Sequence, residues 1–158
     1  VNNSNAVLVW TGSIGFEAIL RGKPVLALSI PYYTDGQGIL KISLETDLNP
    51  ELFSQLLNFL PYKCITVNYD TGNSASLGYD PLEEFKYYGH RISDIHIKDR
   101  KFNSGSVILG TGDVDFSRFF KALDTISYSS PFIMQVYRDD EGVQIFKKQL
   151  DFFRNLLN

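Results

Sequence analysis

Four side chains able to hold a metal ion or a hydroxyl group each stand at the end of an apolar segment of the chain: Glu45, Asp70, His96 and Gln135. Two carboxylates and one imidazole are ligand types that hold Mn²⁺, Mg²⁺ or a similar divalent ion and leave positions open for substrate oxygens. Taken singly, an acidic residue there can cap the next helix, and a lone histidine is more often a core residue. Their recurrence at successive segments favours a shared site, because unpaired charges are costly to gather.

The segments that must position these side chains alternate between strand-like and helix-like patterns. The strand-like segments are interpreted as continuous apolar runs without the alternation of a half-exposed sheet, which favours parallel strands. The predicted strands cover residues 6–10, 24–29, 39–45, 64–69, 92–97 and 132–136, and the predicted helices cover 13–21, 50–60, 81–88, 116–126 and 142–157. This order predicts an α/β fold of parallel β/α repeats, in which catalytic groups stand at the carboxyl ends of the strands.

Length and composition restrict the class of protein. The 158 residues suffice for a sizeable buried core, and the 44% hydrophobic content excludes a disordered tail or a coiled coil. A formal net charge of -3 gives no general attraction to nucleic acid or anionic lipid. The apolar runs are too short to span a bilayer, and the single cysteine, Cys64, cannot form an internal disulfide. We therefore expect a cytoplasmic protein that binds neither nucleic acid nor membrane.

Four longer motifs extend the pattern at the strand ends. They are Leu44-Glu45-Thr46-Asp47, Tyr69-Asp70-Thr71-Gly72-Asn73, Ile95-His96-Ile97-Lys98-Asp99-Arg100 and Leu109-Gly110-Thr111-Gly112-Asp113-Val114-Asp115-Phe116. From about residue 38 onwards, the chain resembles the xylose isomerase-like TIM barrels, which form the sugar phosphate isomerase and epimerase group. The resemblance lies in these motifs and in their order and spacing. The resemblance covers about three quarters of the chain. It is specific, since the last two motifs are hard to find in succession outside this group.

This resemblance implies a divalent-metal-dependent sugar or sugar-phosphate isomerase or epimerase, which moves a proton at the carbon next to a carbonyl. It implies that Glu45, Asp70 and His96 are metal ligands, with Glu45 also the acid/base group. Roles in orienting or binding the substrate are implied for Asn73, Lys98, Arg100 and Gln135. Asp99 is either a hydrogen-bond acceptor or a helix cap, and the glycines of 109–112 are expected to form a tight turn rather than a phosphate-binding loop.

Two features depart from the pattern of the group. Gln135 stands where the epimerases have a second glutamate, and its amide binds a metal or a hydroxyl but accepts no proton at neutral pH. This disfavours a two-base epimerisation and leaves a one-base isomerisation, another residue as partner, or binding without turnover. A full barrel needs eight strand-helix units in about 250 residues, whereas residues 39–158 supply four. We therefore predict a partial TIM barrel.

Residues 1–38 are predicted to form a separate βαβ segment. Residues 11–18 and 21–25 are similar to the nucleotide-sugar domain of polysaccharide-synthesis glycosyltransferases, in which a helix start faces the phosphates. A plain βαβ unit is the alternative. Two other functions therefore stay open: a fragment of a glycosyltransferase fusion, and a non-catalytic module that self-associates. If the half-barrel exists alone, its exposed strand edges predict a homo-oligomer.

Overall fold

The computed structural model describes residues 7–9, 25–27, 42–60 and 63–157. The chain divides into two compact units, Val1–Ile42 and Ser43–Asn158. In the first unit, strands β1 (Val7–Val9) and β2 (Val25–Ala27) pair in parallel, as a βαβ segment requires. The glycine turn and the helix predicted over 11–21 lie outside the described residues.

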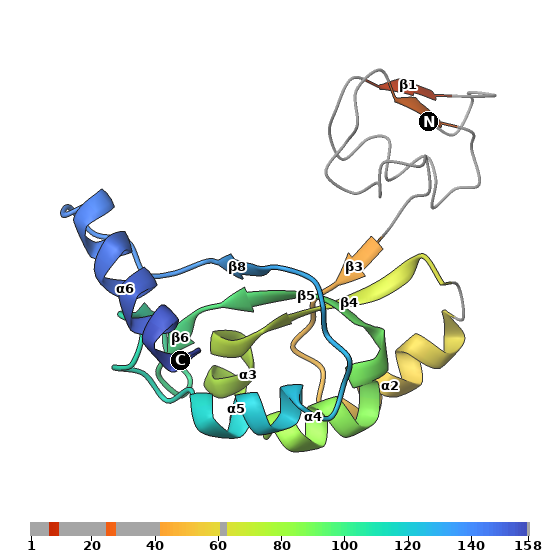
Figure 1. The fold of residues 1–158 in the computed structure, drawn as a ribbon. Helices are drawn as coiled ribbons and strands as arrows, with labels where there is room; N and C mark the ends of the chain where they lie inside the picture. Colours follow the sequence, from red (N-terminus) through yellow and green to blue (C-terminus); the bar gives the residue numbers. More distant parts are fainter. Residues whose placement is uncertain (1–6, 10–24, 28–41, 61–62, 158) are drawn as a thin grey trace. The chain divides into compact units, whose positions relative to one another are not determined.

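A four-stranded sheet positions the side chains of interest (Figure 1). Its order is β3 (Ile42–Leu44), β4 (Ile65–Asp70), β5 (Ile92–Ile97) and β8 (Phe132–Met134). Strand β5 runs parallel to both β4 and β8. The longer helices follow the strands in turn: α2 (Pro50–Phe59), α4 (Pro81–Tyr88), α5 (Phe116–Leu123) and α6 (Val143–Leu156). The predicted partial barrel of parallel β/α repeats is confirmed.

Four shorter elements were not expected from the sequence. They are α3 (Thr71–Leu77), the 3₁₀ turn η1 (Gly89–Arg91), β6 (Asp99–Arg100) and β7 (Ser106–Val107), the last two pairing in an antiparallel ribbon. The predicted starts of the helices at residues 50 and 81 are confirmed, and each is capped: the Asn49 side chain accepts from Leu52 N, and Asp80 accepts from Leu82 N. Among the described residues, no helix is both long and apolar enough to cross a membrane.

The core lies between one face of the sheet and helices α2, α4 and α5, which run along that face (Figure 1). Alternate residues of β4 and β5 are buried there, among them Val67, Tyr69 and Ile95, and the Tyr69 ring packs edge-on against Phe85 at 4.9 Å. The intervening residues are polar and half-buried on the opposite face. The expectation of continuous apolar strands is therefore wrong for β4 and β5, because the described helices α2, α4 and α5 cover one face of the sheet. The polar face carries the candidate site.

Candidate functional site

Glu45, Asp70 and His96, referred to below as the triad, come together at one edge of the sheet. Glu45 directly follows β3, Asp70 ends β4, and His96 lies beside Asp70 in the register of β4 with β5. Each residue offers one ligand atom, and these atoms lie within 4.8 Å of one another. Two ligands on opposite sides of an ion, with bonds of about 2.1 Å, are about 4.2 Å apart. A small side-chain adjustment therefore lets the triad share one ion.

The chemistry of the triad fits a hard divalent cation. Asp70 is only 4% exposed, His96 is half-buried and Glu45 is exposed. The two carboxylates bring two negative charges, and the Lys98 ammonium lies 3.4 Å from Asp70 Oδ2. Oxygen and imidazole donors with this surplus of negative charge suit Mn²⁺, Mg²⁺ or a similar ion. Of the two carboxylates, Glu45 is the one that a molecule from solvent can reach.

Asn68 joins two members of the triad and was missed by the sequence reasoning. Its Nδ2 donates to Glu45 Oε2 at 2.8 Å and lies 3.2 Å from His96 Nδ1. Its Oδ1 is buried and has no hydrogen-bond partner within the described part of the chain. An unpartnered buried oxygen costs about 1–3 kcal/mol and is therefore uncommon. Spacing is the signal that could have found Asn68, because residues two apart on a strand share a face, and Asp70 follows by two.

Helix α3 begins at the end of β4, in a segment for which the sequence predicted no helix or strand. Asp70 caps the helix, since its Oδ1 accepts from the backbone N–H of Asn73 at 2.8 Å. Gly78, with a φ of 74°, ends it in the left-handed conformation that glycine favours. Asn73, in the first turn, donates its side-chain amide to Glu45 Oε1. Asp70 and Asn73 therefore act on the triad from a helix start.

The end of β5 packs closely against this helix start. The Thr71 hydroxyl donates to the carbonyl of Lys98 at 2.6 Å and accepts from the Lys98 backbone N–H at 3.0 Å. A Cβ on Gly72 would lie 2.8 Å from Lys98 Cγ, which is closer than side chains tolerate. The close approach therefore requires glycine at this position. Together Thr71 and Gly72 fix Lys98 relative to Asp70.

Lys98 connects the triad with Gln135. Its ammonium donates to Gln135 Oε1 at 3.0 Å and reaches Asp70 Oδ2 at 3.4 Å. Gln135 follows β8, where its backbone N–H donates to the carbonyl of Ile97 at 3.0 Å. Lys98 and Gln135 both line an open groove of about 830 Å³ between the end of β8 and the start of α6. A groove of this volume accommodates a small molecule.

Arg100 supports Asn73 from the β6 side. Its Nη1 donates to Asn73 Oδ1 at 2.8 Å, while Nε and Nη2 donate to the carbonyl of Ser104 at 2.9 and 2.7 Å. Hydrogen bonds therefore run from Ser104 through Arg100 and Asn73 to Glu45. The structure thus brings Asn73 and Arg100 beside Glu45, and their side chains form hydrogen bonds with other groups of the protein.

Asp99 organises the glycine-rich segment that follows β7. The side chain is 1% exposed and accepts from the backbone N–H groups of Gly110 and Gly112 at 2.9 Å and of Val114 at 3.2 Å. A Cβ on Gly112 would lie 1.9 Å from Asp99 Oδ1, and Gly110 has a φ of 84°. Of the two roles open to Asp99, the structure therefore selects the hydrogen-bond acceptor. The expectation of a tight turn in this segment is confirmed.

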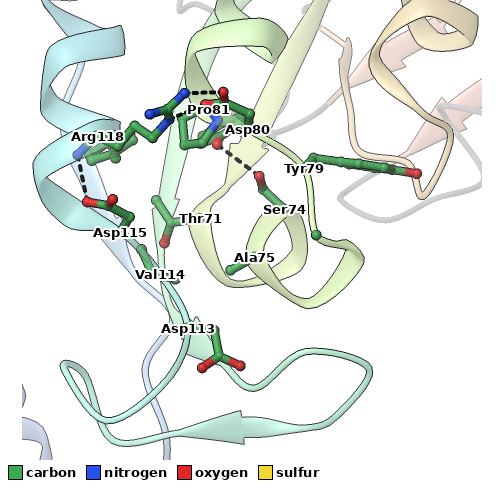
Figure 2. Close-up of a pocket in the computed structure, with 13 residues that line it drawn as sticks. Thr71, Ser74, Ala75, Tyr79, Asp80, Pro81, Asp113, Val114, Asp115 and Arg118 are labelled. Carbon is green, nitrogen blue, oxygen red and sulfur yellow. Dashed lines mark hydrogen bonds and ion pairs between the residues drawn. The ribbon is translucent and has the colours of Figure 1, made fainter.

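A separate hollow of about 270 Å³ lies beside α3, between the starts of α4 and α5 (Figure 2). Its charged side chains hold these helix starts together. Arg118 reaches Asp80, with Nε 2.6 Å from Oδ1, and this partner lowers the pKa of the Asp80 carboxyl. Asp115 caps α5 by accepting from the Arg118 backbone N–H at 2.8 Å. Because its charged groups are engaged in capping and joining helix starts, this hollow is a structural junction beside the candidate site.

A second carboxyl cluster is closed to solvent. Glu84 is 3% exposed and accepts from the hydroxyls of Tyr69 at 2.8 Å, Tyr88 at 2.7 Å and Ser74. Burial raises the pKa of Glu84 above its ordinary value of 4.5, while the three hydrogen bonds act in the opposite direction. Ser74 directly follows Asn73, so this cluster anchors the helix that carries a triad contact. The sequence reasoning did not single out Glu84.

Comparison with known proteins gives consistent matches at the level of family and sequence. Residues 34–156 match the family model described as xylose isomerase-like TIM barrel. An inosose dehydratase of Clostridium perfringens strain 13 is 26% identical over 107 residues, covering 56% of this chain and 36% of that protein. An Escherichia coli K12 protein with the provisional name L-ribulose-5-phosphate 3-epimerase SgbU is 33% identical over 81 residues, covering 47% and 28%. The chain thus spans about a third of these relatives.

Solved structures share the fold at low sequence identity. A xylose isomerase domain protein from Planctomyces limnophilus superimposes with a TM-score of 0.65 at 19% identity, covering 90% of this chain and 63% of that one. The IolI protein, solved with a bound zinc atom, superimposes with a TM-score of 0.58 at 17% identity, covering 92% and 74%. Both likenesses place the described sheet and helices within the same architecture.

Proposed function

The chain belongs to the xylose isomerase-like TIM barrel family, and from that premise we propose that its triad is the divalent-metal site of a sugar or sugar-phosphate isomerase or epimerase. Its sequence relatives include an inosose dehydratase and a protein with the provisional name L-ribulose-5-phosphate 3-epimerase. The observation that carries the proposal is the meeting of Glu45, Asp70 and His96, from three neighbouring strands, within 4.8 Å. Folding alone does not require two carboxylates and an imidazole to gather at one edge of a sheet.

Glu45 is the group that we propose to move the proton. A divalent ion, when bound, polarises a carbonyl and makes the hydrogen on the neighbouring carbon more acidic. Glu45 is exposed, so a substrate can reach it, whereas Asp70 is buried and engaged as the cap of α3. The Asn73 amide holds one oxygen of Glu45, and without a cation the Asn68 amide holds the other. The contact with Asn73 fixes the direction from which the carboxylate meets the substrate.

Lys98 and Gln135 are the residues that we propose to contact the substrate directly. Both line the open groove of about 830 Å³, and Lys98 also reaches Asp70 Oδ2 at 3.4 Å. Ammonium and amide groups suit hydroxyl or phosphate oxygens. Gln135 accepts no proton, which favours a one-base isomerisation through Glu45 over a two-base epimerisation. Asn73 and Arg100 are proposed to contribute next to Glu45, where they line a smaller hollow of about 410 Å³.

Titration of the full chain with Mn²⁺ by calorimetry tests this function. We expect about one ion per chain, and Asp70→Asn or His96→Ala to weaken binding by about 100-fold or more. The first replaces a charged ligand oxygen by an amide group whose oxygen is needed for the cap, and the second removes the imidazole. Asn at position 70 retains the ability to cap α3. Asp113→Asn removes the same charge from the exposed loop beside Lys101, and its affinity should match the wild type. A wild type that retains no divalent ion would contradict the catalytic proposal.

Self-association is proposed for the chain on its own. In the sheet formed by the described residues, β3 and β8 are the outer strands. Strand edges that lack a neighbour pair with other chains, and a closed barrel removes such edges. We therefore expect a mass above that of one chain of 17.9 kDa in size-exclusion chromatography with light scattering. A monomer at micromolar concentration would contradict this expectation without affecting the metal site.

A further inference from the structure

Asn68 has an unusual combination of contacts. Its side-chain nitrogen touches two members of the triad, Glu45 and His96, while its Oδ1 is buried without a partner within the described residues. We propose that Asn68 is a fourth ligand of the divalent ion and binds it through Oδ1 after a half-turn of its carboxamide. This inference rests on the proposed metal site and adds to it a residue outside the triad.

The spacing around Asn68 matches that of a coordination shell. Its Nδ2 is 2.8 Å from Glu45 Oε2 and 3.2 Å from His96 Nδ1. In an octahedral shell with bonds of about 2.1 Å, neighbouring ligand atoms are about 3.0 Å apart. The end of the Asn68 side chain therefore already stands at a ligand's distance from two triad atoms. A half-turn about its last torsion exchanges nitrogen and oxygen at almost the same positions.

The charge of the ion decides which end of the amide faces the triad. Without a cation, an N–H pointing at the carboxylate of Glu45 is favourable, and this is the orientation in the structure. A divalent ion repels the amide NH₂ group and attracts the carbonyl oxygen, so the preference reverses. The half-turn replaces one unpartnered buried atom by another, which leaves the burial cost similar. The gain is the contact between the ion and Oδ1.

Gln135 is less suited to this fourth position. Its Oε1 accepts from the Lys98 ammonium at 3.0 Å, and the same ammonium lies 3.4 Å from Asp70 Oδ2. A positive charge thus stands between Gln135 and the triad. Asn68, in contrast, lies on β4 two residues before Asp70, so its backbone is fixed by the sheet. Only its terminal amide has to rotate.

Two measurements with Mn²⁺ on the full chain test the proposal. Calorimetry gives the affinity, and water-proton relaxation of the bound Mn²⁺ gives the number of coordinated waters. We expect Asn68→Ala to weaken binding on the order of tenfold and to add one coordinated water, because water replaces the lost ligand. Asn68→Asp supplies a charged oxygen at the same place, so it should bind at least as tightly as the wild type with no added water.

Asn73→Asp is the matched control for charge, because Asn73 also donates to Glu45 but from α3. We expect Asn68→Asp to bind Mn²⁺ at least about threefold more tightly than Asn73→Asp. Equal affinities of the two aspartate variants would overturn the proposal. The proposal would also be overturned if Asn68→Ala bound Mn²⁺ more weakly without a change in the number of coordinated waters, because Asn68 would then be a positioning residue and not a ligand. If the wild type binds no Mn²⁺, both the proposed metal site and its fourth ligand are contradicted. If the wild type binds Mn²⁺ and substitution of Asn68 leaves the affinity unchanged, only the fourth ligand is contradicted.

Discussion

Two carboxylate clusters, one around Glu45 and one around Glu84, each contact one of two consecutive residues of α3. They differ in how completely their polar groups are paired. Asn73 donates to the exposed Glu45 of the triad, and the next residue, Ser74, donates to the buried Glu84. Three hydroxyls donate hydrogen bonds to the two oxygens of Glu84. The triad instead combines two carboxylates and an imidazole with one ammonium, and beside it an amide oxygen has no partner within the described residues.

This difference separates a packing cluster from a ligand site. Around the buried Glu84, three hydroxyls donate to the two carboxylate oxygens, so no acceptor remains for a ligand to satisfy. At the triad, each carboxylate oxygen also has a donor, but two carboxylates face a single ammonium and the Asn68 Oδ1 has no partner within the described residues. This surplus of negative charge is the condition under which a cation stabilises a site. The raised pKa of Glu84 therefore marks a structural group, even though perturbed carboxyls often mark active sites. In this protein, the local balance of donors, acceptors and charge separates a ligand site from a packing cluster better than a shifted pKa does.

The largest expected effect comes from removing the buried carboxyl. Glu84→Ala leaves the hydroxyls of Tyr69, Ser74 and Tyr88 without their acceptor and opens a small cavity. We expect the free energy of unfolding to fall by about 3 kcal/mol, measured by urea denaturation. In protein that remains folded, the Mn²⁺ affinity should change by less than about threefold, because Glu84 is not a ligand.

His96→Ala provides the converse of this experiment. His96 is half-buried and belongs to the triad, so its loss should remove Mn²⁺ binding while changing the free energy of unfolding by less than about 1 kcal/mol. If Glu84→Ala abolished Mn²⁺ binding in folded protein, or if His96→Ala cost as much stability as Glu84→Ala, the two clusters would not be separable in this way.

The positions of the triad could be predicted because they depend on the repeat alone. Parallel strands bring their carboxyl ends to one edge, so a residue at the end of each predicted strand is placed by the order of elements. Spacing places Asn68 on the same face as Asp70, but it does not give the contacts of Asn68. Those contacts with Glu45 and His96 also depend on the pairing register, which shifts between Val67 and Asn68.

Helix α3 and the Glu84 cluster could not be predicted for related reasons. Thr71–Leu77 is rich in Gly, Ser, Asn and Thr, which are weak helix formers, so the segment resembles a loop. The cap by Asp70 and the left-handed Gly78 define it as a helix. Glu84 looks like a solvated residue of α4 in the sequence. Its burial depends on how α4 docks against Tyr69, which is a tertiary property.

The smallest expected effect is a pH dependence that separates the two clusters without disrupting either. Burial raises the pKa of Glu84 in the folded chain above its ordinary value of 4.5, so the folded state holds this proton more tightly than the unfolded state. Where the folded state binds more protons, the free energy of unfolding falls as pH rises. The contribution of Glu84 is complete below its ordinary pKa and is lost as pH rises through the raised value.

Glu84→Gln isolates this contribution, because the amide keeps an acceptor oxygen for the hydroxyls and does not titrate. We expect the free energy of unfolding of the wild type, minus that of Glu84→Gln, to decrease as pH rises above 4.5. Asp80 has the opposite sign, since pairing with Arg118 lowers its pKa and its contribution is lost as pH falls. Asp80 is present in both proteins, so its effect cancels in the difference. The measurement is urea denaturation of both proteins across this pH range. If the difference in free energy of unfolding is flat or rises with pH, burial does not control the Glu84 proton. The contrast between a closed cluster and an open triad would then lose its physical basis.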